Sequence, residues 1–243
     1  MRKQVKILGV PLDRVTLKEC GEITKKLIKI SNKSCKIIVA PNVEFVMTAQ
    51  RDKEFKEILQ HSELATPDSV GIMWAAKRYK APISERIPGQ AYFRKVIEIA
   101  EKEGWTIYLL GGMQGIPELT RENLLKIYPN VKIIGLHHGY FNNEEEKEVI
   151  EEINKLQPNV LFVALGAPKQ EKWIYRNKDI LKVDVAAGQG GTFDYEAGRI
   201  ARAPKIIQKM GIEWLYRLVR QPKRIWRMRV LPVFVLKVLF DKK

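Results

Sequence analysis

Cysteine and histidine are scarce in this sequence. The 243 residues include two cysteines and three histidines. Two thiols, Cys20 and Cys35, cannot build a disulfide scaffold, and no Cys-x-x-Cys or Cys/His cluster predicts structural zinc. His137 and His138 are adjacent, so their side chains point in opposite directions in an extended chain. We therefore expect a reducing compartment, no metal site and no cofactor.

Long apolar runs and common nucleotide-binding motifs are also missing. Lys6 and Pro11 interrupt the apolar stretch near the N-terminus, which is not typical of a signal peptide. No run of about 18 apolar residues predicts a membrane-spanning helix. The patterns GxxxxGK[ST] and Asp-x-Asp do not occur, and no GxGxxG follows the first apolar run. These absences disfavour NTPases, kinases and dinucleotide-binding enzymes, and they predict a cytoplasmic protein.

Negative charge is scarce toward the C-terminal end. The whole chain has 43 Lys and Arg against 28 Asp and Glu, a net charge of +15. Residues 199–243 contain thirteen basic and two acidic residues, so this segment alone carries +11. Apolar and aromatic residues alternate with the basic ones, as in interfacial helices that bind anionic membranes. An exposed apolar patch of this kind also favours a homo-oligomer.

A rival polyanionic partner for the basic segment is nucleic acid. No helix-turn-helix, RNP or zinc-finger pattern supports that alternative. We therefore expect an anionic membrane surface rather than nucleic acid as the partner, with the protein peripheral on the inner face of the cell membrane.

Strand-like and helix-like segments alternate along the first 196 residues. Apolar runs of strand length occupy 5–10, 36–40, 106–111, 131–136, 160–166 and 183–188. Helical spacing of apolar residues appears between them, at 17–30, 93–100, 119–128 and 149–156. This alternation predicts an α/β domain over residues 1–196, a Rossmann-like, mainly parallel sheet with helices on both faces. Residues 197–243 are predicted to form a basic, helical, membrane-associating appendage that completes the active site.

Small and polar residues follow the predicted strands, where ligands bind in such sheets. Asp68 is either a general base or the N-cap of a helix at 69–79. Asn42 is an N-cap or Asx-turn candidate. The glycine turn at 188–191 is either a tight turn or a diphosphate cradle made of backbone N–H groups.

Nine short strings, in one order, resemble the WecG/TagA/CpsF glycosyltransferases (glycosyltransferase family 26), and the TagA branch most. The likeness covers about residues 5–235. The strings are PNVE (41–44), PDSVG (67–71), ERIPG (85–89), LLGG (109–112), HHGYF (137–141), LGAPKQE (165–171), GTFD (191–194), RAP (202–204) and EWLYR (213–217).

The resemblance implies an enzyme with a UDP-activated sugar donor and a polyprenyl-diphosphate-linked acceptor. TagA-like members transfer N-acetylmannosamine from UDP-ManNAc to GlcNAc-diphosphoundecaprenol, inverting to a β-1,4 linkage, in the synthesis of the wall teichoic acid linkage unit. They are metal-independent. Members often carry Thr before the Pro-Asn pair, where this sequence has Ala40. A sibling transferase that uses glucose or ManNAc uronic acid for an exopolysaccharide therefore stays an alternative, and a nucleic-acid-binding module is the second.

The resemblance also implies roles for single residues. Asp68 corresponds to the base, and Asn42, Arg86 and Gln170 line the site. An inverting transfer needs one carboxylate for the acceptor proton and positive charge or amides for the leaving diphosphate. The residues expected to meet that diphosphate are Arg86, the amides of Gly188, Gly190 and Gly191 and, by resemblance and position, Arg217, Arg224 and Arg227.

Overall fold

A six-stranded parallel sheet forms the centre of the computed structural model, which describes residues 3–201, 204, 216, 218 and 228–241. Every strand pair in this sheet is parallel. The prediction of an α/β fold with a parallel sheet is therefore confirmed. The spatial order is β4 (Leu64–Ala65), β3 (Lys36–Val39), β8 (Val185–Gly188), β7 (Val160–Ala164), β5 (Thr106–Gly111) and β6 (Lys132–His137).

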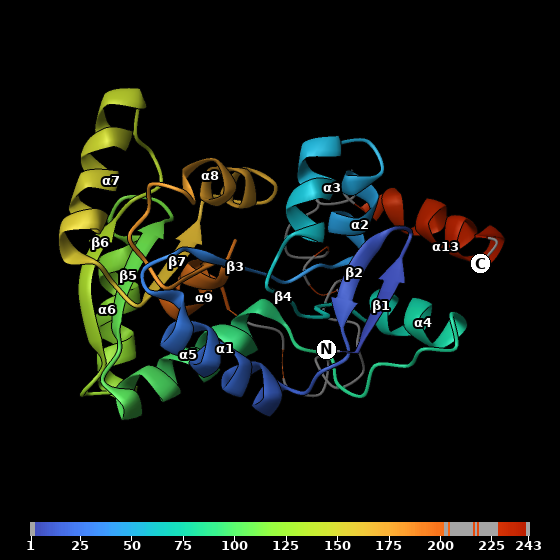
Figure 1. The fold of residues 1–243 in the computed structure, drawn as a ribbon, viewed down its shortest axis with the longest axis horizontal. Coiled ribbons are helices and arrows are strands. Elements are labelled where there is room, and N and C mark those ends of the chain that lie inside the picture. Colours follow the sequence, from blue (N-terminus) through green and yellow to red (C-terminus); the bar gives the residue numbers. More distant parts are fainter. Residues whose placement is uncertain (1–2, 202–203, 205–215, 217, 219–227, 242–243) are drawn as a thin grey trace.

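Helices cover both faces of the sheet (Figure 1). Successive strand residues face opposite sides, so that Leu109 belongs to one apolar core and Leu110 to the other. The Leu109 side packs against α1 (Leu17–Ser31), α5 (Gly89–Glu103), α6 (Ile116–Ile127) and α9 (Thr192–Glu196). The Leu110 side packs against α2 (Val43–Ala49), α3 (Lys53–Gln60), α4 (Val70–Arg78), α7 (Asn143–Leu156), α8 (Lys169–Asn177) and α13 (Val230–Phe240).

Local sequence signals explain where several helices begin and end. Thr16 starts α1 with a capping box, because its side chain accepts from the Glu19 amide and the Glu19 carboxylate accepts from the Thr16 amide. Asn142 starts α7 in the same way. Gly104 ends α5 in the left-handed conformation that glycine adopts without strain, as the sequence predicted.

The first apolar run forms a hairpin, so the prediction of one strand at residues 5–10 is wrong. The chain turns at Leu8 and Gly9, whose φ angles are 47° and 82°. This turn joins β1 (Gln4–Ile7) to the antiparallel β2 (Val10–Asp13), and the pair lies outside the six-stranded sheet. The buried carboxylate of Asp13 accepts from the Ala65 amide at 2.8 Å, which attaches the hairpin to β4.

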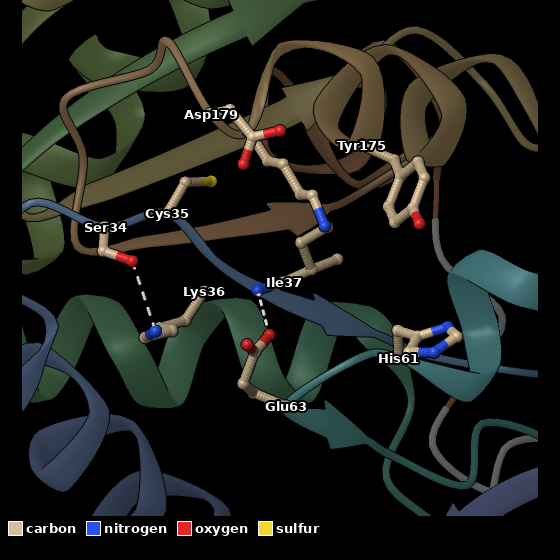
Figure 2. A pocket seen from close by; sticks show the side chains of 9 residues that line it. Ser34, Cys35, Lys36, Ile37, His61, Glu63, Tyr175 and Asp179 are labelled. Atoms are coloured by element: carbon tan, nitrogen blue, oxygen red, sulfur yellow. Dashed lines mark hydrogen bonds between the residues drawn. The ribbon is translucent and has the colours of Figure 1, made fainter.

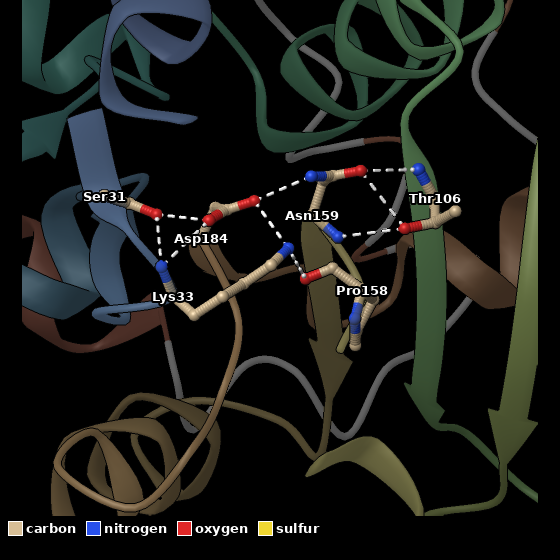
Figure 3. Close-up of polar contacts among 6 residues, drawn as sticks. All are labelled: Ser31, Lys33, Thr106, Pro158, Asn159 and Asp184. Atoms are coloured by element: carbon tan, nitrogen blue, oxygen red, sulfur yellow. Dashed lines mark hydrogen bonds and ion pairs between the residues drawn. The ribbon is translucent and has the colours of Figure 1, made fainter. Parts of the chain in front are cut away.

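A buried polar network closes the amino edge of the sheet, where β5, β7 and β8 begin (Figure 3). Asp184 lies at its centre and is 4% exposed. Its carboxylate accepts from the Ser31 hydroxyl, from Lys33 Nζ at 2.8 Å and from Asn159 Nδ2 at 2.7 Å. Asn159 Oδ1 in turn accepts from the Thr106 amide at 2.9 Å. The network therefore joins the end of α1 to the start of three strands.

Helix α13 packs against α2 and α4, at the end of the molecule that also holds the hairpin (Figure 1). Phe234 and Val238 are each 1% exposed and belong to the same core as those helices. This part of the predicted appendage therefore packs on the α/β domain, and the division at residue 196 stays a prediction. Within the described residues, no helix is both long enough and apolar enough to cross a membrane.

Candidate active site

A cavity of about 400 Å³ opens at the carboxyl ends of β3, β7 and β8, beside the loop that follows β4. This is the edge where a parallel sheet is expected to bind ligands. Most of the predicted site residues line it together, although they come from distant parts of the sequence. These residues are Asn42, Asp68, Gln170, Gly188, Gly190 and Gly191.

Asp68 lies half-buried on this cavity, directly before α4. The N-cap of α4 is Ser69, whose hydroxyl accepts from the Ile72 amide at 3.4 Å. The alternative that Asp68 is the N-cap is therefore wrong. The Asp68 amide donates to the Pro41 carbonyl at 3.2 Å, so the loops after β3 and β4 are joined at this point. The Asp68 carboxylate is thus held at the strand edge without serving as the helix cap.

Asn42 has the structural role that its position predicted and also lines the cavity. Its Oδ1 atom accepts from the Phe45 amide at 3.1 Å and begins α2. The amide nitrogen of the same side chain takes no part in this cap. One side chain can therefore fix the start of α2 and present a donor to a ligand.

The glycine turn after β8 rests on the side chains of Gln170 and Glu171. Gln170 Oε1 accepts from the Gly190 amide at 2.9 Å, and Gly190 has a φ of 45°. A Cβ on Gly188 would lie 2.4 Å from Glu171 Oε1 and 2.5 Å from Gln170 Nε2, so a larger residue there would displace these two side chains. Because Gln170 already accepts from the Gly190 amide, this N–H group could reach a diphosphate only if Gln170 gave it up.

Glu171 is the most unusual ionisable group near the cavity. Its side chain is 1% exposed, and Oε1 accepts from Gln170 Nε2 at 2.6 Å. Its other oxygen, Oε2, is buried and has no hydrogen-bond partner among the described residues. Burial raises the pKa of Glu171 to about 7, because the charged form loses its hydration, while the hydrogen bond from Gln170 opposes the rise.

Arg86 does not line the cavity in this conformation. It lies two residues before Pro88, which does line it, and the next amide, of Ile87, donates to the Pro67 carbonyl at 2.8 Å. The segment that carries Arg86 is therefore held beside the segment that carries Asp68. The other predicted cations, Arg217, Arg224 and Arg227, lie outside the described residues.

Several lining residues were not singled out from the sequence as site residues. Glu44 belongs to the PNVE string, Thr192 belongs to the GTFD string and Gln189 lies within the glycine turn, so these three could have been found from the sequence, whereas the others carry no motif of their own. Gln189 is 6% exposed, and its Oε1 is buried without a hydrogen-bond partner in the described part of the chain. The additional polar lining residues are Glu44, Thr48, Gln90, Gln189, Thr192 and Tyr195.

A smaller cavity of about 150 Å³ lies near the opposite, amino edge of the sheet (Figure 2). Its lining includes Cys35, His61 and Glu63, and the Glu63 carboxylate accepts from the Ile37 amide at 2.6 Å. Burial raises the pKa of the Cys35 thiol to about 12, which makes it a poor nucleophile. Across the described ranges, no group of three or more His, Cys, Asp and Glu residues could hold a metal ion.

The chain matches proteins of known name over nearly all of its length. The model of the Glycosyl transferase WecG/TagA/CpsF family matches residues 5–243. Two curated relatives, from Staphylococcus aureus strains MW2 and NCTC 8325, are named N-acetylglucosaminyldiphosphoundecaprenol N-acetyl-beta-D-mannosaminyltransferase. Each is 32% identical over 240 residues, which cover 99% of this chain and 94% of the relative. The chain therefore belongs to the Glycosyl transferase WecG/TagA/CpsF family.

Proposed function

We propose that this protein transfers N-acetylmannosamine from UDP-ManNAc to GlcNAc-diphosphoundecaprenol, with inversion to a β-1,4 linkage. The observation that carries the proposal is the cavity at the carboxyl edge of the sheet, where Asp68 is gathered with Asn42, Gln170 and the glycine turn. The names of the Staphylococcus aureus relatives supply the sugar and the acceptor. The product would be the linkage unit of wall teichoic acid.

In the proposed reaction Asp68 is the general base. Its carboxylate takes the proton from the 4-hydroxyl of the acceptor GlcNAc while that oxygen forms a bond to the anomeric carbon of the donor. The bond from that carbon to the diphosphate oxygen breaks, and its electron pair leaves with UDP. One displacement inverts the anomeric centre. The assignment is supported by the position of Asp68 on the cavity and by Ser69, which caps α4 in its place.

The leaving UDP carries charge that the protein must stabilise. The sequence has no Asp-x-Asp pair for a divalent metal, so arginines and backbone amides would stabilise the diphosphate. Arg86 is held near Asp68 by the Ile87 amide, and the turn at Gly188, Gly190 and Gly191 borders the cavity. The arginines at 217, 224 and 227 complete the proposed set.

A membrane surface is proposed as the place where the lipid-linked acceptor is met. Val230 lines the cavity and is the first residue of α13. Further along α13, one side of the helix is exposed and apolar, although Phe234 and Val238 are buried. Trp74 of α4 contacts Phe234, with ring centroids 6.4 Å apart, and is itself 37% exposed. The exposed apolar residues of α4 and α13 are Val70, Trp74, Val233, Val235, Leu236, Leu239 and Phe240.

The two helices that carry these seven residues, the α4–α13 surface, also carry basic residues. Lys77 and Arg78 end α4, and Lys237 lies in the last turn of α13. A combination of exposed apolar and basic side chains suits an interface with anionic lipids. The acceptor's sugar lies one diphosphate away from its lipid tail, so a cavity adjoining such a surface suits the substrate.

Transfer of radiolabelled sugar from UDP-ManNAc to a short-chain lipid-diphosphate-GlcNAc analogue tests the proposed function. A panel of UDP-sugars in the same assay separates the sibling alternatives, because transfer of glucose or of ManNAc uronic acid with no transfer of ManNAc would overturn the sugar assignment. Flotation with anionic and neutral liposomes tests the membrane partner. Equal flotation with both kinds of liposome would contradict the proposed electrostatic contribution.

A further inference from the structure

Glu171 lies where a carboxyl group lowers the stability of the fold. The proposed reaction does not use this residue. Its side chain is 1% exposed in the first turn of α8, and one of its two oxygens has no partner among the described residues. A buried carboxyl without full hydrogen bonding destabilises a fold compared with an apolar side chain of similar size. Such groups are concentrated at functional sites.

Two consecutive hydrogen bonds connect Glu171 to the cavity. Glu171 Oε1 accepts from Gln170 Nε2 at 2.6 Å, and Gln170 Oε1 accepts from the Gly190 amide at 2.9 Å. Gln170 is 3% exposed, and the backbone of Gly188 lies against both side chains. The connection therefore runs from α8, through one buried amide group, to the turn that borders Asp68's cavity.

The ionised form of Glu171 permits only one orientation of the Gln170 amide. A carboxylate accepts hydrogen bonds but cannot donate them, so Gln170 must turn its NH₂ group toward Glu171. Gln170 then offers its oxygen to the Gly190 amide, as observed. A protonated Glu171 could donate to the Gln170 oxygen, and the NH₂ group would then face the Gly190 N–H, donor against donor.

We infer that Glu171 is a positioning residue: its carboxylate fixes the Gln170 amide, and Gln170 fixes the glycine turn at the cavity. Glu171 does not touch the substrate in this arrangement. The inference rests on the proposed function only in its consequence for turnover, since the orientation of the turn is a property of the free protein.

The charged groups packed around α8 do not fix the protonation state of Glu171. Lys172 pairs with Asp52 at 2.7 Å and with Glu54 at 2.8 Å, and Arg176 pairs with Glu54 at 3.0 Å. Within the described part of the chain, no charged group contributes to the shift of the Glu171 pKa to about 7, which comes mainly from burial. The proton on Glu171 should therefore exchange near neutral pH.

The chemical shift of the Gly190 amide in the free protein tests the inference without any substrate. In a ¹⁵N–¹H spectrum of the whole chain, this signal should titrate with a midpoint near the pKa of about 7. Glu171→Gln should abolish the titration. Glu152→Gln is the matched control. Glu152 lies on α7, where its carboxylate accepts from the Tyr108 hydroxyl at 2.9 Å, so this substitution should leave the Gly190 titration unchanged.

Turnover supplies the second readout, and it separates positioning from a merely structural role. The kcat of the parent should fall on the acid side of the Glu171 midpoint, and Glu171→Gln should lose that limb. Glu171→Met, which removes the acceptor, should lower kcat by about 10-fold or more, because small displacements at a reacting site are expensive. Its melting temperature should not fall.

Three results would overturn the inference. They are a Gly190 signal that still titrates near neutral pH in Glu171→Gln, a parent signal that does not titrate there, and a folded Glu171→Met protein with parental kcat. Failure of the proposed function would look different, since no UDP-sugar would be transferred while the Gly190 titration and its loss in Glu171→Gln persisted.

Discussion

Each edge of the sheet buries a carboxyl group, and the pKa values of the two groups are shifted in opposite directions. Asp184, at the amino edge, receives hydrogen bonds from Ser31, Lys33 and Asn159. Burial alone would raise its pKa, but these three partners together lower it below the ordinary value. Glu171, at the carboxyl edge, accepts from Gln170, one of its oxygens has no partner among the described residues, and burial raises its pKa to about 7.

The difference separates a structural edge of the sheet from the edge that holds the proposed active site. At the amino edge the hydrogen bonds to Asp184 join α1 to the starts of β7 and β8, so removal of the carboxylate should disturb the fold. At the carboxyl edge, buried oxygens of Thr66, Glu171 and Gln189 have no partner in the part of the structure that is described. Unsatisfied polar atoms lower stability, and they are tolerated where a site needs them.

Replacement of Asp68 should give the largest effect on turnover. Asp68→Asn removes the proposed base but leaves the Ser69 cap of α4 intact, so kcat should fall about 10²–10⁴-fold without loss of the fold. Transfer kinetics and the melting temperature of the same preparation check both parts. Retention of near-parental turnover would show that Asp68 is not the general base.

Replacement of Asp184 should give the largest effect on stability. Asp184→Ala leaves Lys33, Asn159 and Ser31 without their shared acceptor, so the free energy of unfolding should fall by about 3–5 kcal/mol. Chemical denaturation measures the change, and Asp179→Ala, at an exposed position nearby in the chain, is the control. Turnover per folded molecule should stay parental; a specific loss of kcat would remove the distinction between the two edges.

The two carboxylates should also give stability opposite dependences on pH. Asp184 contributes stability above its unfolded pKa of 3.8 and loses it as the pH falls through its lower folded value. Glu171 has its full contribution below its unfolded pKa of 4.5 and loses it as the pH rises through about 7. Their contributions can therefore be separated by measuring unfolding across this range.

Glu171→Gln should remove the second of these dependences. Relative to the parent, the variant should gain unfolding free energy between about pH 4.5 and pH 7, by about 3 kcal/mol at most. Denaturation curves at the two ends of that window give the difference, with Glu152→Gln as control. A gain that is equal at both ends would mean that Glu171 does not titrate in the folded protein.

Removal of divalent metal should have the smallest effect. Without an Asp-x-Asp pair, the proposed reaction relies on arginines and amides, so transfer should continue at parental rate in EDTA. Loss of activity in EDTA that Mn²⁺ restores would assign the diphosphate to a metal instead.

Buried strands and capped helices were predictable because their signals are local. The apolar runs at β5 and β7 and the Gly104 stop of α5 all lie where the sequence placed them. The hairpin was missed because an apolar run does not reveal a left-handed turn at Leu8. Helices α2, α3 and α8 were missed because they are only seven to nine residues long, which is too short for a clear helical spacing of apolar residues.

The cavity was predictable in its parts but not in its contacts. The rule that ligands bind beyond the carboxyl ends of parallel strands gathers Asn42, Asp68 and the glycine turn. No spacing rule, however, places Gln170 between Glu171 and Gly190, since that depends on how α8 packs against β8. The arginines at 217, 224 and 227 stay predictions.

The location of a bound donor tests the central claim most directly. We predict that a crystal structure with UDP-ManNAc will place the sugar nucleotide in the cavity at the carboxyl edge, with its anomeric carbon facing Asp68 and its diphosphate near Gly188–Gly191. A donor bound at the amino edge, in the smaller cavity lined by Cys35, His61 and Glu63 (Figure 2), would contradict the account.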